Sequence, residues 1–236
     1  MKKILGPLRR GVEKYEMIKP GDRIAVGLSG GKDSTALLYA MKRFQYFSPV
    51  PFELEGITLD MGFGGMDLTP LVDLCARLDI PYTIKKTLIG PIVFEERQEK
   101  NPCSLCARMK RGALHDLAIE RDCRTIALGH HADDAIETFF LSLFYEGRIN
   151  TFSPVTYLDR KDITLIRPLI FVKERDIIGD PEMKALPVIQ STCPANGYTK
   201  REDIKIMIKN LRKTMPDLDD RVLGAIQNKE QLNLWF

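Results

Sequence analysis

The feature that most restricts the fold is the stretch of residues 21–44, where a buried strand runs through a glycine-rich turn into a helix. Residues 21–28 (GDRIAVGL) form a mostly apolar run that starts at a turn residue, as buried strands do. After the turn, apolar residues recur at helical spacing, at Ala36, Leu37, Ala40, Met41 and Phe44. A strand followed by a glycine turn and a helix is the opening of a parallel α/β unit.

The same alternation of strand and helix continues along the chain. Further strands are predicted at residues 52–59, 81–86, 124–128 and 163–166, and helices at residues 68–78, 105–119 and 132–145. Two more helices are predicted near residues 202–213 and 219–227. Together they indicate the α/β class, with an open, mostly parallel sheet and helices on both faces.

Length and composition indicate one large domain. The 236 residues divide into a basic helical segment (1–20), a catalytic domain (21–190) and a C-terminal helical segment (191–236) that carries Cys193. No run approaches the roughly eighteen apolar residues of a membrane span, so we expect a cytoplasmic protein with no membrane partner. Trp235, near the chain end, is a candidate contact for a homodimer.

Positive charge gathers in three clusters although the net charge is only +3. Such clusters suit a polyanion such as RNA, but solvated helix faces produce them too, and both interpretations stay open here. The clustered residues are Lys2, Lys3, Arg9, Arg10 and Lys14, then Arg108, Lys110 and Arg111, then Lys200, Arg201, Lys205, Lys209, Arg212 and Lys213.

The glycine turn has the composition of a phosphate site. It consists of Ser29, Gly30, Gly31, Lys32, Asp33 and Ser34. A loop that leaves a parallel strand and enters a helix directs backbone N–H groups and the helix dipole at an anion. The spacing excludes a Walker loop. The string SGGKDS resembles the PP-loop ATP pyrophosphatases, which implies that residues 29–34 bind ATP and that AMP is transferred to a carbonyl oxygen before a nucleophile displaces it.

A second polar block, Gly129-His-His-Ala-Asp-Asp134, also lies between a predicted strand and a helix. Because the carboxyl ends of neighbouring parallel strands share one crevice, we expect this block to face the same nucleotide. Asp134 is a candidate to hold Mg²⁺ or to orient the substrate base; the alternative is that the aspartates only cap a helix. Asp60, at the end of the second strand, is a weaker catalytic candidate for the same crevice.

A third block contains Cys103 and Cys106 in a C-x-x-C pair, with Cys193 far downstream. Three thiolates can hold an iron–sulfur cluster and leave one iron without a protein ligand. A zinc ion or a dithiol that passes on a persulfide would use the same residues, and the residue chemistry does not separate the three. Cys75 and Cys123 are predicted to be packed in the core.

Over its whole length the chain resembles the tRNA 2-thiocytidine synthetases. The resemblance rests on SGGKDS, on Cys103-Ser-Leu-Cys106, on the block at 129–134, on Ile166-Arg-Pro-Leu169 and on Cys193. It implies a 4Fe-4S cluster on the three cysteines, ATP contacts from Gly129 and His130, and catalytic roles for Lys110 and Asp134. One departure is that Cys193 stands alone, where many members carry a second C-x-x-C pair.

The resemblance implies an enzyme that adenylates a base carbonyl oxygen of tRNA with ATP and Mg²⁺ and replaces it with sulfur, most simply in an anticodon-loop cytidine. Its partners would be tRNA and a sulfur donor such as a cysteine desulfurase. The rival hypotheses are a thiouridine synthetase, a lysidine-forming or amidating PP-loop enzyme, and a non-catalytic regulator that binds ATP or metal.

Overall fold

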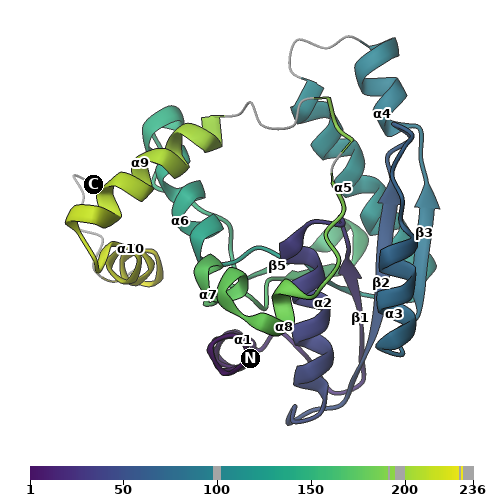
Figure 1. Ribbon diagram of the computed structural model, residues 1–236, viewed down its shortest axis with the longest axis horizontal. Helices are drawn as coiled ribbons and strands as arrows, with labels where there is room; N and C mark the ends of the chain where they lie inside the picture. The colour runs from purple at the N-terminus through teal and green to yellow at the C-terminus, as the bar shows by residue number, and fades with distance from the viewer. Residues whose placement is uncertain (98–101, 191, 195–199, 229, 231–236) are drawn as a thin grey trace.

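The computed structural model describes residues 1–97, 102–190, 192–194, 200–228 and 230. Its centre is a six-stranded sheet in the order β3-β2-β1-β4-β6-β5 (Figure 1). The first five strands in this order are parallel to their neighbours, and β5 pairs antiparallel with β6. The strands are β1 Asp22–Gly27, β2 Phe52–Asp60, β3 Tyr82–Lys86, β4 Thr125–Ala127, β5 Val155–Leu158 and β6 Ile163–Ile166.

The helices cover both faces of this sheet, which confirms the predicted α/β class. Those before the last strand are α1 Lys2–Lys14, α2 Lys32–Gln45, α3 Thr69–Arg77, α4 Ile89–Pro91, α5 Pro102–Glu120 and α6 Ala132–Leu141. The later ones are α7 Glu174–Gly179, α8 Pro181–Lys184, α9 Lys200–Thr214 and α10 Leu218–Gln227. Shorter π-helical turns span Ile92–Glu96 and Ser142–Glu146, and a 3₁₀ turn spans Asp159–Lys161.

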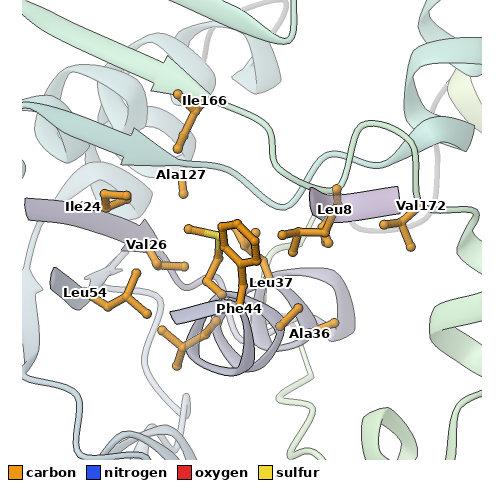
Figure 2. Packing of buried hydrophobic residues seen from close by; sticks show 14 of the residues in the cluster. Leu8, Ile24, Val26, Ala36, Leu37, Phe44, Leu54, Ala127, Ile166 and Val172 are labelled. Atoms are coloured by element: carbon orange, nitrogen blue, oxygen red, sulfur yellow. The ribbon is translucent and has the colours of Figure 1, made fainter. Parts of the chain in front are cut away.

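Two hydrophobic clusters lie on opposite faces of the sheet because successive strand residues point to opposite sides. In β1, Ile24 and Val26 belong to the cluster that contains α1, α2 and α3, whereas Ala25 belongs to the cluster under α5. Figure 2 shows the first cluster, in which Phe44 of α2 and Leu8 of α1 are fully buried. The basic N-terminal helix is therefore part of the core of the domain.

The edge strand β5 was not predicted. It has four residues of mixed burial, and Tyr157 is 61% exposed. A short edge strand with one open side shows too little apolar alternation to be recognised from its sequence. The helix predicted over residues 132–145 also differs from the structure, because its regular part ends at Leu141 and a π-helical turn follows.

The C-terminal helices α9 and α10 pack on α6 through a separate small cluster. It is built from Ile136 of α6, Ile204 and Ile208 of α9, and Leu218 of α10. Within the described ranges, none of the helices combines the length and hydropathy that crossing a membrane requires. Trp235, the candidate dimer contact, lies outside the described residues.

Candidate functional site

The predicted phosphate loop, residues 29–34, follows the end of β1 and runs into the first turn of α2 (Figure 1). Its shape is held by its own hydroxyl groups: the Ser29 amide donates to Ser34 Oγ at 3.2 Å, and Ser34 Oγ donates to the Gly31 carbonyl oxygen at 2.9 Å. Gly30 has a φ of +84°, which L-residues rarely adopt. Since Gly31 is the N-cap of α2 and has no side-chain acceptor, the first amides of this helix keep their capacity to bind an anion.

Lys32 lies between two carboxylates. Its Nζ donates to Asp33 at 2.9 Å and forms an ion pair with Glu174 at 2.6 Å. Burial alone lowers the pKa of Lys32, but the hydrogen bonds to Glu174 and Asp33 outweigh burial, so its pKa is raised overall. The lysine therefore stays charged, as a phosphate ligand must.

His131 joins the same group of side chains. One ligand atom each from Asp33, His131 and Glu174 lies within 4.8 Å of the others, a spacing that would suit a metal ion. Sequence reasoning identified Asp33 but missed Glu174 and assigned no role in the site to His131. Glu174 starts α7 after the Arg-Pro-Leu run, and no local motif indicates that it lies beside Lys32.

The second polar block lies directly against the start of α2, and that it faces the same nucleotide as the loop stays a prediction. A Cβ added to Gly129 would come within 3.0 Å of the Asp33 backbone, so a glycine is required for this close approach. His131 Nε2 also lies 3.6 Å from Asp33 Oδ1. The structure thus brings residues 29–34 and 129–134 together at one end of the sheet.

Asp134 has the helix-capping contacts that were considered as the alternative to a catalytic role. Its carboxylate accepts the His131 amide at 3.0 Å, and its own amide donates to His131 Nδ1 at 3.4 Å, which forms a capping box on α6. Arg201 of α9 also donates to Asp134, at 3.4 Å. The neighbouring Asp133 is buried and accepts both the Glu174 amide and Arg212.

The His130 ring packs on Phe152, with ring centroids 5.0 Å apart. Burial, followed by the charge of Arg167, lowers the pKa of His130 to about 4, so the imidazole is neutral at pH 7. Its Nδ1 and the Arg167 Nε are buried and lack hydrogen-bond partners within the described part of the chain. The ATP contact expected of His130 stays a prediction.

Cys103 and Cys106 lie in the first turn and a half of α5, at i and i+3, and Lys110 follows on the same helix face. Burial raises the pKa of Cys106, the nearby Cys193 and Cys103 raise it further, and Lys110 opposes them. Although Cys193 is far away in sequence, it is therefore close enough to interact electrostatically with Cys106. Cys75 and Cys123 are buried, as predicted, and burial raises each pKa to about 11.

The segment that leads to Cys193 packs directly on the phosphate loop. The Ile189 amide donates to the Gly30 carbonyl oxygen at 2.8 Å, and a Cβ on Gly30 would lie 2.9 Å from the Ile189 Cβ. Asp60 lies at the end of β2, next to β1, but its described side-chain contact is with the Gly62 amide of its own loop, at 3.0 Å. The segment that precedes Cys193 is thus in contact with the loop, and the catalytic role of Asp60 stays a prediction.

A parallel sheet with this glycine loop at the end of β1 defines a nucleotide-binding α/β protein of the PP-loop class. A family model described as the PP-loop domain matches residues 7–183. A tRNA-cytidine(32) 2-sulfurtransferase of Pelobacter propionicus is 37% identical over 93% of this chain and 82% of its own length. Its counterpart in Geobacter sulfurreducens is 35% identical over 96% and 90%. The chain therefore belongs to the PP-loop family, in the group of these sulfurtransferases.

Solved structures agree with this placement. The U34-tRNA thiolase of Methanococcus maripaludis, solved with its 4Fe-4S cluster, is 25% identical with a TM-score of 0.74 and covers 95% of this chain and 78% of that one. An NH3-dependent NAD synthetase of Campylobacter jejuni, at 20% identity and a TM-score of 0.51 over 96% and 93% of the two chains, shares the fold.

Proposed function

We propose that this chain is an ATP-dependent tRNA sulfurtransferase that replaces the C2 oxygen of an anticodon-loop cytidine with sulfur. The observation that carries the proposal is the contact between the phosphate loop and the segment that precedes Cys193: Ile189, four residues before Cys193, is hydrogen-bonded to Gly30 of the loop. The names of the relatives support cytidine 32 as the target.

The nucleotide half of the site uses the loop and its neighbours. The loop amides, the hydroxyls of Ser29 and Ser34, and the Lys32 ammonium bind the ATP phosphates. The carboxylates of Asp33 and Glu174 suit the accompanying Mg²⁺, because this hard cation prefers oxygen ligands. The Lys32 ammonium, which contacts both carboxylates, would contact the phosphates instead when ATP binds. Asp134, which caps α6 beside this group, keeps its proposed role of holding Mg²⁺ or orienting the substrate base.

The donor atoms in the cysteine half of the site fit a 4Fe-4S cluster. Cys103, Cys106 and Cys193 are three partly or fully exposed thiols, and Cys103 and Cys193 both lie near enough to Cys106 to raise its pKa, while Cys75 and Cys123 are buried. A cluster held by these three would supply an iron with no protein ligand, which can carry sulfur for the transfer. Lys110, on the same helix face as Cys106, stabilises negative charge near the thiolates.

The reaction proceeds by two substitutions. First, the C2 oxygen of the base attacks the α-phosphorus of ATP; an O–P bond forms and the bond to the β-phosphate breaks, which releases pyrophosphate. Second, sulfur at the sulfide level attacks C2; the C–S bond forms and the C–O bond breaks, so that AMP leaves with the oxygen. Lys32 balances the phosphate charge in both steps.

The proposal includes the partners expected from the sequence: tRNA, and a sulfur donor such as a cysteine desulfurase, in the cytoplasm. A homodimer and the division of the chain at residues 20 and 190 stay predictions. Thiolation of uridine is the second candidate, because the solved relative with the 0.74 TM-score acts on U34 of tRNA.

The test is an anaerobic reaction of the purified chain with ATP, Mg²⁺, sulfide and an unmodified tRNA transcript, followed by mass spectrometry of the nucleosides. We expect 2-thiocytidine at position 32, with one AMP and one pyrophosphate for each sulfur inserted. Iron and acid-labile sulfide, about four of each per chain, should be lost in Cys193→Ala and kept in Cys123→Ala, the matched control with a buried cysteine.

The other outcomes separate the rivals. Sulfur in uridine 34 would establish the second candidate instead. AMP without sulfur in the RNA, and no iron in the protein, would favour a lysidine-forming or amidating enzyme. Nucleotide binding without pyrophosphate release would support the hypothesis of a non-catalytic regulator.

A further inference from the structure

An exposed apolar surface begins where the regular part of α6 ends. Every residue from Leu143 to Asn150 is exposed, and this stretch contains Phe144 (56%), Tyr145 (50%) and Ile149 (52%). Single exposed apolar side chains are common, but several within one short segment indicate a binding surface. Residues 143–149 together with Lys200 are called the α6 platform below.

The backbone turns these side chains outward and holds them there. The helix changes to a π-helical turn over Ser142–Glu146 and stops at Gly147, whose φ is +65°. Ser142 Oγ donates to Glu146 Oε2 at 3.0 Å and braces the turn. Turns of this kind often occur at functional sites because they redirect side chains from the helix pattern.

The Phe144 ring packs on an aromatic ring of α6. Phe144 stacks on Phe140 with ring centroids 5.7 Å apart and an angle of 16° between the planes. Phe140 in turn packs against the small cluster that joins α6 to α9 and α10. A ring that is held on one side and exposed on the other can accept a second flat group by stacking.

Positive charge lies beside the rings. Lys200 Nζ is 5.5 Å from the centre of the Tyr145 ring, and its side chain is 71% exposed; Asp203 lies 3.7 Å from it. Arg148 is also exposed, in the next loop. Aromatic rings next to cations are the combination that binds unpaired nucleotides, since bases stack on the rings while phosphates pair with the charges.

The α6 platform connects directly to the candidate site. The same helix has Asp134 in its first turn, and at 1.5 Å per residue Tyr145 lies about 16 Å further along. Arg201, next to Lys200, bonds both Asp134 and Thr138. In Figure 1, α6 and α5 lie on opposite sides of the start of α2.

We propose that Phe144 and Tyr145, with Lys200 and Arg148, form a stacking surface for the unpaired nucleotides next to the reacting base. This inference rests on the proposed function, because it takes the anticodon loop of tRNA as the occupant. The exposed rings flanked by Lys200 and Arg148 favour RNA over an apolar protein partner, because bases stack on rings and phosphates pair with cations, although Glu146 and Asp203 offset part of the positive charge. The platform would thereby select a target base that lies in a single-stranded loop.

The test compares the binding of two RNAs by fluorescence anisotropy: an anticodon stem-loop, and the same stem closed into a continuous duplex. Tyr145→Ala and Phe144→Ala should each weaken stem-loop binding roughly tenfold, which is the size of one lost stacking contact, and leave duplex binding unchanged. Tyr145→Phe should bind like the wild type, whereas Tyr145→Leu should bind like the alanine variant. Tyr46→Ala, which removes a 75% exposed tyrosine at the far end of α2, is the matched control.

The inference and the proposed function fail in different ways. If the wild-type chain binds the stem-loop and Tyr145→Ala or Tyr145→Leu binds it equally well, the platform is not a stacking surface, although the function stands. If Tyr145→Ala instead abolishes a dimer seen by sedimentation and keeps its RNA affinity, the surface is an interface between copies and the inference is overturned. If the wild-type chain binds no stem-loop, both the stacking surface and the proposed function are contradicted.

Discussion

Gly30 belongs to the phosphate loop and also contacts Ile189, in the segment that leads to Cys193. Its backbone has a φ that favours glycine, its carbonyl oxygen accepts the Ile189 amide, and its missing side chain leaves room for the Ile189 Cβ. A single position therefore shapes the phosphate loop and fixes the segment that carries Cys193. Sequence reasoning assigned only the first of these roles to Gly30.

Gly30→Ala should lower the free energy of unfolding by about 1–3 kcal/mol, because an L-residue is strained at this φ and the new Cβ would lie 2.9 Å from the Ile189 Cβ. Urea denaturation without nucleotide measures the change. The control is Gly31→Ala in the same loop, where φ is −74° and the nearest atom to an added Cβ is at 3.5 Å. Equal losses in the two variants would contradict the contact with Ile189.

Glu137 is a buried acid one turn beyond Asp134. Burial raises its pKa to about 7; Asp134 and Glu174 raise it too, while Lys205 and Arg201 oppose them. Because the folded-state pKa lies above the ordinary value of 4.5, the folded protein holds this proton more tightly than the unfolded chain. Its contribution to stability is therefore complete below about pH 4.5 and is lost as the pH rises through about 7.

Replacing this acid by its amide should remove that pH dependence. Between pH 5 and pH 8, the wild type should lose about 2–3 kcal/mol of unfolding free energy relative to Glu137→Gln, since one pKa unit corresponds to about 1.4 kcal/mol. Urea denaturation at several pH values gives the difference. Glu13→Gln, which changes an exposed acid on α1, should keep the wild-type slope, and parallel curves for wild type and Glu137→Gln would show that Glu137 titrates normally.

At the scale of elements, α6 joins several parts of the molecule. Its N-terminus lies at the phosphate loop, and its side is covered by α9 through both apolar and charged contacts. Three cations along α9 pair with three carboxylates of α6: Arg201 with Asp134, Lys205 with Glu137, and Arg212 with Asp133. The basic cluster on α9 thus has a structural role in addition to any attraction for RNA.

Arg212→Ala should lower the free energy of unfolding by about 2–3 kcal/mol, because the buried Asp133 keeps only one of its two donors, the Glu174 amide. Urea denaturation again measures the effect. Arg221→Ala on α10 is the control: its ion pair with Asp217 is exposed and should contribute less than about 1 kcal/mol. A similar small loss in both variants would show that Arg212 does not stabilise Asp133.

At the scale of the whole molecule, the parallel sheet and its phosphate loop were predictable from local sequence. Strands β1, β2, β4 and β6 contain neighbouring apolar residues, and β3 was also predicted. Helices α2, α3 and α5 show apolar spacing, and the loop carries its own motif. The edge strand β5 and the π-helical turn at Ser142–Glu146 were not predicted, since each depends on packing against its neighbours.

The sequence by itself determined the residue chemistry: a glycine loop for phosphate, two cysteines one helical turn apart, and a third cysteine downstream. Only the tertiary structure brought Glu174 to Lys32 and Asp33, and the segment that precedes Cys193 to Gly30. Motifs and periodicity depend on residues a few positions apart and can therefore be recognised in the chain. Contacts between distant segments depend on how the sheet and its helices pack, and no short pattern contains that information.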